Sequence, residues 1–173
     1  MARQAPAAPG VRVGLGRDSH PFGPGDGLRL GGIEIPGAPR LHGHSDGDVA
    51  IHALAGALLG AAGLGDLGSL FPADARTPRG IASTELLRDV VGRVDAAGWR
   101  PRSVSVAIVA ARPRLGSRLP AMRVAIGSVL GLDPGLVAVD ASTGNLSGDE
   151  GAGRTISATA VATVEPLDDE AGR

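Results

Sequence analysis

Three of the four histidines of this chain, His42, His44 and His52, lie in one short polar segment. The fourth, His20, stands two residues after Asp18, and side chains two apart on a strand point the same way. Because the chain has no cysteine, any transition-metal site must be built from imidazole and carboxylate groups. Together the two segments can supply an Asp-His-His ligand set with a vacant fourth position, which is typical of a catalytic zinc site.

The second segment also has a purely structural interpretation. Ser45 and Asp48 fit a helix-capping box, in which Ser45 accepts from an early backbone amide and Asp48 reaches back. Asp48 and His52 are four residues apart, so on a helix they share one face. A single histidine is usually a structural or surface residue, but capping does not account for four histidines confined to two short motifs. We therefore predict a metal site, with the cap contributing as well.

The elements that must position these side chains form a mixed α and β pattern, with a hairpin and at least one strand–helix–strand unit. Helices are expected at about 45–62 and 83–97, and from about 120 to 130. Strands are expected at 11–15, 28–30, 33–35, 104–111, 137–141 and 155–164. The glycine-rich stretch 144–154 is expected to be a loop that faces a ligand.

The length of 173 residues suits one domain with its own core, and no linker or internal repeat is visible. We expect this α+β domain to span 11–165, with flexible tails at 1–10 and 166–173. Aromatic residues make up only 2% of the chain, so the core must come from Val, Leu, Ile and much Ala. Small side chains bury little area each, so further burial in an oligomer is favoured.

Composition excludes several classes of function. The net charge of −1 gives no attraction to nucleic acid or anionic lipid, and the scarcity of aromatic residues argues against base stacking. All seventeen basic residues are Arg, which excludes a Schiff-base or phosphate-binding lysine. No nucleophile elbow or cysteine nucleophile is present. No apolar run reaches the length of a membrane span and no signal peptide is visible, so we expect a cytoplasmic protein without membrane or nucleic-acid partners.

Two polar turns point to a phosphorylated substrate and a divalent cation. Asp66 and Gly68 offer a carboxylate for ligand hydroxyls and an amide for phosphate oxygens, although an ordinary helix-exit turn explains them better when they are taken alone. Ser142, Thr143 and Gly144 offer hydroxyls and amides to a phosphate, and a strand-end turn accounts for them equally well.

The motifs match a known family. They are Asp18-Ser19-His20, the stretch Leu30 to Pro36, His44 to His52, the stretch Ala57 to Gly68, and Phe71-Pro72. With these motifs the chain resembles the 2-C-methyl-D-erythritol 2,4-cyclodiphosphate synthases, the cyclising enzymes of non-mevalonate isoprenoid biosynthesis. The likeness is dense up to Pro72 and looser to Val164.

The resemblance implies a homotrimer of α+β subunits, each with a mixed sheet and helices packed on one face, and with active sites between neighbouring subunits. It implies zinc ligands at Asp18, His20 and His52, and catalytic roles for His44 and Thr143. The substrate-binding positions that it implies are Asp18, Ser19, His20, His44, Ser45, Asp66, Leu67, Gly68, Ala110, Arg114, Ser142, Thr143, Gly144 and Asn145.

The chemistry implied by the resemblance needs no protein nucleophile. The 2-phosphate of a cytidine diphosphate substrate attacks the β-phosphorus of the same molecule, and CMP leaves. Positioning and charge neutralisation therefore carry catalysis. The resemblance further implies zinc or another divalent transition metal at the Asp-His-His set, and Mg²⁺ or Mn²⁺ across the diphosphate.

The chain departs from the family pattern in the stretch 142–155. Asn145 stands where the family has an acidic ligand of the second metal, Ala152 replaces a phosphate-binding arginine, and Asp149 replaces an aromatic residue. One interpretation is an active synthase whose altered loop compensates locally through Asp149, Glu150 and Arg154. The alternative is a zinc-binding trimeric paralogue that binds a phosphorylated ligand without cyclising it.

Overall fold

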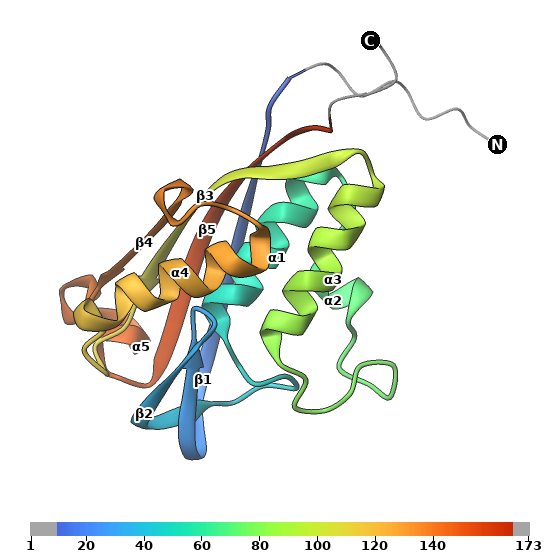
Figure 1. The fold of residues 1–173 in the computed structure, drawn as a ribbon. Helices are drawn as coiled ribbons and strands as arrows, with labels where there is room; N and C mark the ends of the chain where they lie inside the picture. The colour runs from blue at the N-terminus through green and yellow to red at the C-terminus, as the bar shows by residue number, and fades with distance from the viewer. Residues whose placement is uncertain (1–9, 168–173) are drawn as a thin grey trace, which may run out of the picture.

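The computed structural model describes residues 10–167, and the predicted tails lie mostly outside this range. Five strands form one sheet in the order β2-β1-β5-β3-β4 (Figure 1). The strands are β1 (Arg12–Leu30), β2 (Ile33–Leu41), β3 (Trp99–Val109), β4 (Val137–Ser142) and β5 (Thr155–Pro166). β3 and β4 run parallel, and the other neighbours are antiparallel. The predicted mixed sheet is confirmed.

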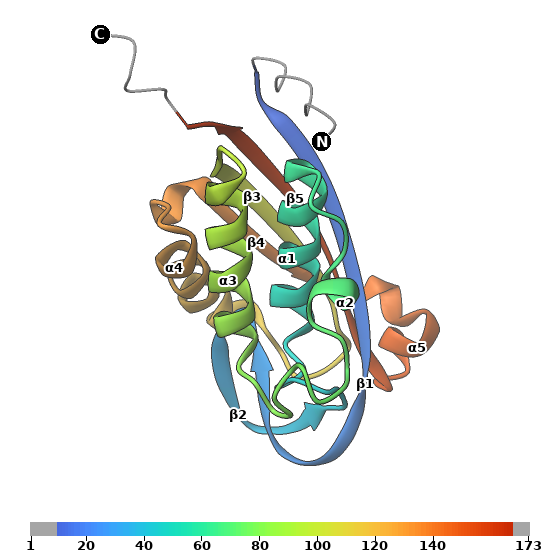
Figure 2. The same ribbon diagram turned by 90° about the vertical axis from the view of Figure 1, so that its right-hand side faces the viewer.

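Five helices connect and flank the strands. They are α1 (Val49–Ala62), α2 (Leu67–Leu70), α3 (Ser83–Ala96), α4 (Leu119–Leu130) and α5 (Gly148–Gly151). The three long helices α1, α3 and α4 cover one face of the sheet, whereas α5 lies on the other side beside β1 and β5 (Figure 2). Because α4 joins the parallel pair β3 and β4, it forms the predicted strand–helix–strand unit. No helix within residues 10–167 has the length and apolar character needed to span a membrane.

The predicted hairpin is confirmed at Gly31-Gly32, where Leu30 pairs with Ile33. Both glycines have positive φ, at 62° and 80°, which explains why residues without a side chain occupy the turn. Leu28 and Leu30 near the end of β1 are completely buried, so one side of this hairpin is part of the core.

Three sequence expectations need correction. β1 does not end near Gly16 but runs on to Leu30, because it pairs first with β5 up to Pro21 and then with β2. The apolar alternation stops where β1 carries the polar site residues, so the pattern hid the strand. α1 begins at Val49 and not at Ser45, since Asp48 itself caps the helix. The stretch 144–154 contains a 3₁₀ turn (Gly144–Leu146) and α5 rather than a plain loop.

The contact between β1 and α1 is unusually close. Gly14 and Gly16 of β1 lie against the backbone of Ala57 and Ala53 of α1, and neither glycine has room for a Cβ atom. This approach packs the first turns of α1 directly onto the strand that carries Asp18. The distance between strand and helix is therefore set by backbone contact rather than by side chains.

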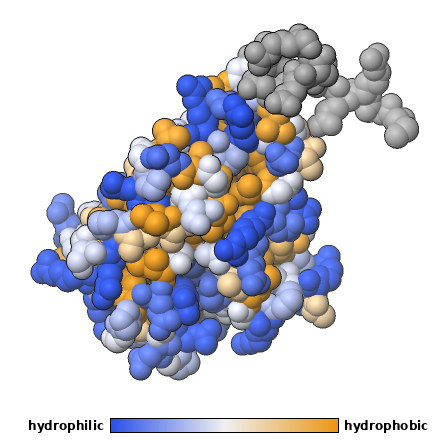
Figure 3. All heavy atoms as spheres, viewed as in Figure 1, coloured by the Kyte–Doolittle hydropathy of each residue, from blue (hydrophilic) through white to orange (hydrophobic). Residues whose placement is uncertain are grey.

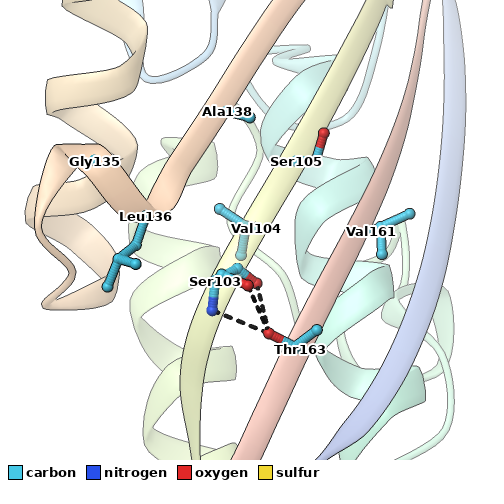
Figure 4. A pocket seen from close by; sticks show the side chains of 8 residues that line it. All are labelled: Ser103, Val104, Ser105, Gly135, Leu136, Ala138, Val161 and Thr163. Carbon is cyan, nitrogen blue, oxygen red and sulfur yellow. Dashed lines mark hydrogen bonds between the residues drawn. The ribbon is translucent and has the colours of Figure 1, made fainter.

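Within residues 10–167, the opposite face of the sheet carries no long helix and remains partly apolar. Val13, Leu15 and Val161 are exposed there, at 65%, 68% and 38%. A cavity of about 310 Å³ lies on this face, and Thr163 Oγ1 accepts there from the Ser103 amide over 3.1 Å. Figure 4 shows the side chains that line it. In the view of Figure 3, hydrophobic surface also runs through the middle of the molecule between hydrophilic margins.

Candidate metal centre and substrate pockets

The Asp-His-His set predicted from the sequence is brought together. Asp18 and His20 extend from the same side of β1, and His52 reaches them from the second turn of α1. Asp18 Oδ2 lies 2.9 Å from His20 Nε2 and 3.0 Å from His52 Nδ1, and the two imidazole nitrogens are 3.2 Å apart. These three residues form a group of potential metal ligands, half-buried and within 4.8 Å of one another.

The donor geometry fits a divalent ion. Three ligand atoms at tetrahedral positions and about 2.0–2.1 Å from a zinc ion are separated by roughly 3.3 Å. The observed separations of 2.9–3.2 Å are close to this value. Asp18 Oδ2 and the two histidine nitrogens form a triangle of ligand atoms. A metal ion bound to these three atoms has a fourth coordination position on the other side, where a further ligand can bind. The triad therefore suits a divalent metal ion that keeps one position open.

The electrostatics of the triad favour a charged carboxylate. Burial raises the pKa of Asp18, but the close contacts of its carboxylate with the His20 and His52 rings outweigh burial and hold the pKa well below its usual value. The hydrogen bond to Asp18 in turn raises the pKa of His20. An ionised carboxylate beside two imidazoles is the form that binds a cation.

A pocket of about 300 Å³ opens beside the triad. Its lining includes four further residues that the sequence analysis named as substrate-binding positions, namely His44, Ser45, Leu67 and Gly68. His44 Nε2 donates to the carbonyl oxygen of Thr77 over 2.7 Å, which orients the ring at the pocket wall. The pocket also contains Thr77 and Leu86, which the sequence analysis did not single out, and Phe71, which it named only as part of a family motif. Phe71 and Thr77 lie in the segment between α2 and α3, whose path no local pattern predicted, and Leu86 lies on α3.

Asp66 occupies an adjoining groove of about 460 Å³, which Asp18, His52 and Gly68 also line. Its carboxylate caps α2 by accepting from the amide and the hydroxyl of Ser69, over 2.9 and 2.7 Å. The hydrogen bond from the Ser69 hydroxyl lowers the pKa of Asp66. Asp66 is exposed, so the cap leaves it open to solvent and to a ligand.

Asp48 does not take part in the triad. Its side chain is buried, and its carboxylate accepts from the amides of Gly31, Gly32 and Ile51 over 2.9, 2.7 and 3.1 Å. Burial raises the pKa of this carboxyl, although the three amides oppose the shift. Asp48 thus ties the hairpin turn to the start of α1, a structural role close to the predicted cap.

The second group of predicted residues forms a separate pocket at the ends of β3 and β4. This pocket has a volume of about 460 Å³ and is lined by Ala110, Arg114, Ser142 and Thr143, among others. None of its lining residues also lines the pocket beside the triad, which we call the metal-side pocket. Within one chain, Thr143 is therefore not placed beside His44. Two further substrate positions, Gly144 and Asn145, lie in the 3₁₀ turn that follows Thr143 and do not line this pocket. Ser19 is exposed and stands one residue out of phase with Asp18 and His20 on β1.

The turn after β4 explains one departure of the sequence from the family pattern, the asparagine at position 145. Asn145 and Leu146 both have left-handed backbone, with φ of 54° and 57°. Asparagine tolerates this conformation better than most residues with a side chain, so Asn145 suits the local backbone. It belongs to the 3₁₀ turn that follows Thr143, and it is exposed.

The rest of this loop is held by charges and by Arg112, which lies just beyond the end of β3. Arg154 pairs with Asp149, and hydrogen bonds from its own amide and from Ser157 lower the pKa of Glu150. Arg112 donates from Nε and Nη2 to the carbonyl oxygen of Gly153 over 3.2 and 3.0 Å. The loop that borders the second pocket is therefore fixed to the β3 end of the sheet.

The mixed sheet and the Asp-His-His triad define a single-domain α+β protein with a candidate metal centre at a strand–helix contact. The chain belongs to the YgbB family, whose model matches residues 11–165. A 2-C-methyl-D-erythritol 2,4-cyclodiphosphate synthase of Symbiobacterium thermophilum is 48% identical over 152 residues, which cover 88% of this chain and 97% of that protein.

Solved structures agree with this assignment. A synthase of the same name, solved with CDP bound, aligns with a TM-score of 0.78 at 36% identity and covers 89% of this chain and all of that one. A CDP complex of IspF from Plasmodium falciparum aligns with a TM-score of 0.80 at 27% identity and covers 94% of this chain and all of that chain. The fold that the sequence predicted is thus the fold of these synthases.

Proposed function

We propose that this protein is a 2-C-methyl-D-erythritol 2,4-cyclodiphosphate synthase, an enzyme of non-mevalonate isoprenoid biosynthesis. It converts 4-diphosphocytidyl-2-C-methyl-D-erythritol 2-phosphate to the 2,4-cyclodiphosphate and releases CMP. The observation that carries the proposal is the convergence of Asp18, His20 and His52 beside a polar pocket, in a chain whose full-length relatives bear that enzyme's name.

The reaction forms one phosphorus–oxygen bond and breaks another. An oxygen of the 2-phosphate attacks the β-phosphorus, and the bond from this phosphorus to the oxygen shared with the α-phosphate breaks, so that CMP carries that oxygen and the electron pair away. His44 and Ser45 line the metal-side pocket and hold the phosphate groups in line. Asp66 accepts from the hydroxyls of the methylerythritol unit, and Thr143 donates to an oxygen that gains charge in the transition state.

Two metal ions fit this scheme. Zinc at Asp18, His20 and His52 supplies Lewis-acid polarisation of a phosphate oxygen when it is bound. Mg²⁺ or Mn²⁺ would supply charge neutralisation at the diphosphate, because hard cations prefer oxygen ligands. In this chain Asn145 offers the second ion a neutral amide oxygen, with the carboxylate of Glu150 a few residues away along the same loop.

We further propose that the active site is shared between copies in a homotrimer. Thr143 and Arg114 belong to a pocket that has no residue in common with the pocket of His44 and Ser45. A cytidine diphosphate substrate must reach both groups of residues, and a neighbouring subunit can supply the second group. The exposed apolar side chains on the uncovered sheet face, among them Leu15 and Val161, provide a surface for such packing.

The paralogue that binds without cyclising is not favoured. The relatives that match across nearly the whole chain are named as synthases, and Arg112, just beyond β3, donates to the Gly153 carbonyl oxygen of the loop with the altered residues. Asn145 has a left-handed backbone conformation, which asparagine tolerates well, so its presence is not evidence of lost activity.

Turnover of the cytidyl substrate tests the proposed function. The purified protein, supplied with Zn²⁺ and Mg²⁺, is incubated with the substrate, and the products are identified by phosphorus NMR. We expect equal amounts of CMP and a cyclic diphosphate. Binding of CDP without any conversion of the substrate would instead establish the binding-only paralogue.

A further inference from the structure

We propose that Asp46 and Ser83 act as positioning residues for the metal centre by fixing which ring nitrogen of His52 carries hydrogen. They hold the hydrogen on Nε2, so that Nδ1 faces Asp18 and His20 as a bare ligand. This inference rests on the metal site of the proposed function and adds two residues that the sequence motifs did not assign to it.

His52 uses its two ring nitrogens in opposite directions. Nδ1 lies 3.0 Å from Asp18 Oδ2 and 3.2 Å from His20 Nε2, inside the triad. Nε2 lies 2.9 Å from Ser83 Oγ and 2.9 Å from Ser45 Oγ, on the side away from the triad. Which nitrogen binds the metal therefore depends on the hydrogen bonds that the other nitrogen makes.

The direction of the hydrogen bonds follows from the number of hydrogens available. Ser83 Oγ donates to Asp46 Oδ1, and the Ser83 amide donates to Asp46 Oδ2 over 3.1 Å. A carboxylate only accepts and a hydroxyl has a single hydrogen, so Ser83 Oγ has no hydrogen left for His52. It must accept, and His52 Nε2 must donate. A neutral imidazole has one N–H, and Nδ1 is therefore bare.

Asp46 is itself held in place. Its amide donates to the carbonyl oxygen of Ile81 over 3.1 Å, and the amide of Asp48 donates to Asp46 Oδ1 over 3.2 Å. Ser83 is completely buried and is the first residue of α3, where the helix dipole favours a negative charge nearby. Ser83, the middle member of the chain of hydrogen bonds from Asp46 to His52, is thus shielded from water.

Ser45 remains available for the substrate. Its Oγ accepts from the Gly47 amide over 3.1 Å and faces His52 Nε2, which is a donor, so neither contact uses the Ser45 hydrogen. Ser83 Oγ lies 3.5 Å from Ser45 Oγ, at the limit of hydrogen-bonding distance, so it holds this hydrogen only weakly. That hydrogen can then be donated to a phosphate oxygen in the pocket beside the triad. Asp46 and Ser83 would in this way orient both the metal ligand and the hydroxyl next to it.

Replacement of Ser83 by two residues of the same shape tests the inference. Ser83→Thr keeps a hydroxyl, and Ser83→Val has the same volume without one, so both variants share any packing cost of the added methyl group. Metal-free wild type and variants are titrated with Co²⁺, and affinity is read from the visible absorption of the bound ion. We expect Ser83→Val to bind Co²⁺ about 10- to 100-fold more weakly than Ser83→Thr, the usual effect of losing a partner of a metal ligand.

Asp46→Asn provides a second variant, because both oxygens of Asp46 accept hydrogen bonds and an amide offers only one acceptor. We expect it also to weaken Co²⁺ binding. Thermal melting with and without metal separates this effect from general stability, since only the metal-dependent increase in Tm reports the site. Equal Co²⁺ affinity of the Thr and Val variants would overturn the role of Ser83 and leave the metal site intact. A wild type that binds no Co²⁺ would overturn the metal site itself.

Discussion

Gly16 of β1 lies against Ala53 of α1 so closely that a Cβ atom on Gly16 would stand 2.0 Å from the Ala53 carbonyl oxygen. Asp18 is two residues further along β1, and His52 precedes Ala53 on α1. The contact therefore fixes the distance between two members of the metal triad, and it does so through the backbone.

The first prediction concerns this contact. Gly16→Ala must push α1 away from β1, so we expect weaker metal binding and a loss of several kcal/mol in the free energy of unfolding, as for other overpacked cores. Denaturant unfolding and Co²⁺ titration measure the two effects. Gly92→Ala in α3, where a Cβ atom meets nothing within 4 Å, is the matched control and should stabilise the protein by about 0.5–1 kcal/mol. Equal behaviour of the two variants would contradict the steric argument.

The second prediction concerns Asp48. In Asp48→Asn one carboxylate oxygen becomes an NH₂ group that faces a backbone amide donor, from Gly31, Gly32 or Ile51. We expect a loss of about 1–3 kcal/mol in the free energy of unfolding, the usual cost of a buried donor without an acceptor. Metal affinity per folded molecule should change little, because Asp48 is not a ligand. If Asn at this position abolishes metal binding in a folded protein, Asp48 belongs to the metal site after all.

The third prediction concerns the second cation. Asn145→Asp adds a negative charge at nearly the same size, in a residue type that tolerates left-handed backbone. A carboxylate is the better ligand for Mg²⁺, so half-maximal turnover should be reached at lower Mg²⁺ concentration. Asn145→Gly keeps the backbone conformation without a ligand and should need more Mg²⁺ than wild type. A Mg²⁺ dependence that neither variant alters would place the second cation on another group, with Asp149 and Glu150 the carboxylates of the same loop.

The fourth prediction concerns the shared active site. His52→Ala inactivates the metal-side pocket and Thr143→Ala the nucleotide-side pocket, so each homotrimer should be inactive. Mixed trimers contain one site with both halves intact. Random assembly of equal amounts should therefore restore about a quarter of wild-type turnover, since three quarters of the trimers are mixed and each has one intact site in three. If the mixture stays as inactive as its parents, although light scattering shows mixed trimers, the site lies within one subunit.

Much of the fold could be predicted because the long helices and the hairpin follow local rules. Apolar periodicity marked α3 and α4 to within about two residues, and Gly31-Gly32 marked the hairpin turn. β1 was underestimated because polar residues of the site interrupt its alternation. The start of α1 was misplaced because Ser45, Asp46 and Asp48 are all good capping residues, and only the tertiary contact with the hairpin selects Asp48.

The metal triad could be predicted because its ligands lie in two short motifs of rare residue types. The residues that contact the triad or line the pocket beside it could not be predicted. Ser83 is an ordinary helix-start residue in the sequence, and its contact with His52 depends on how α3 packs beside α1. The pocket residues Phe71 and Thr77 belong to a loop that no periodic pattern describes. The separation of the two pockets within one chain likewise follows from the sheet order and not from any motif.

The central claim is that Asp18, His20 and His52 hold a metal ion that the cyclisation requires. Its most direct test combines metal content with turnover: elemental analysis of protein purified without added metal, then phosphorus NMR of the same sample before and after the metal is removed and restored. The account predicts about one zinc per chain, loss of cyclic diphosphate formation on removal, recovery on addition of Zn²⁺, and neither metal nor activity in a folded His52→Ala variant. Full turnover by metal-free wild type, or by His52→Ala, would contradict it.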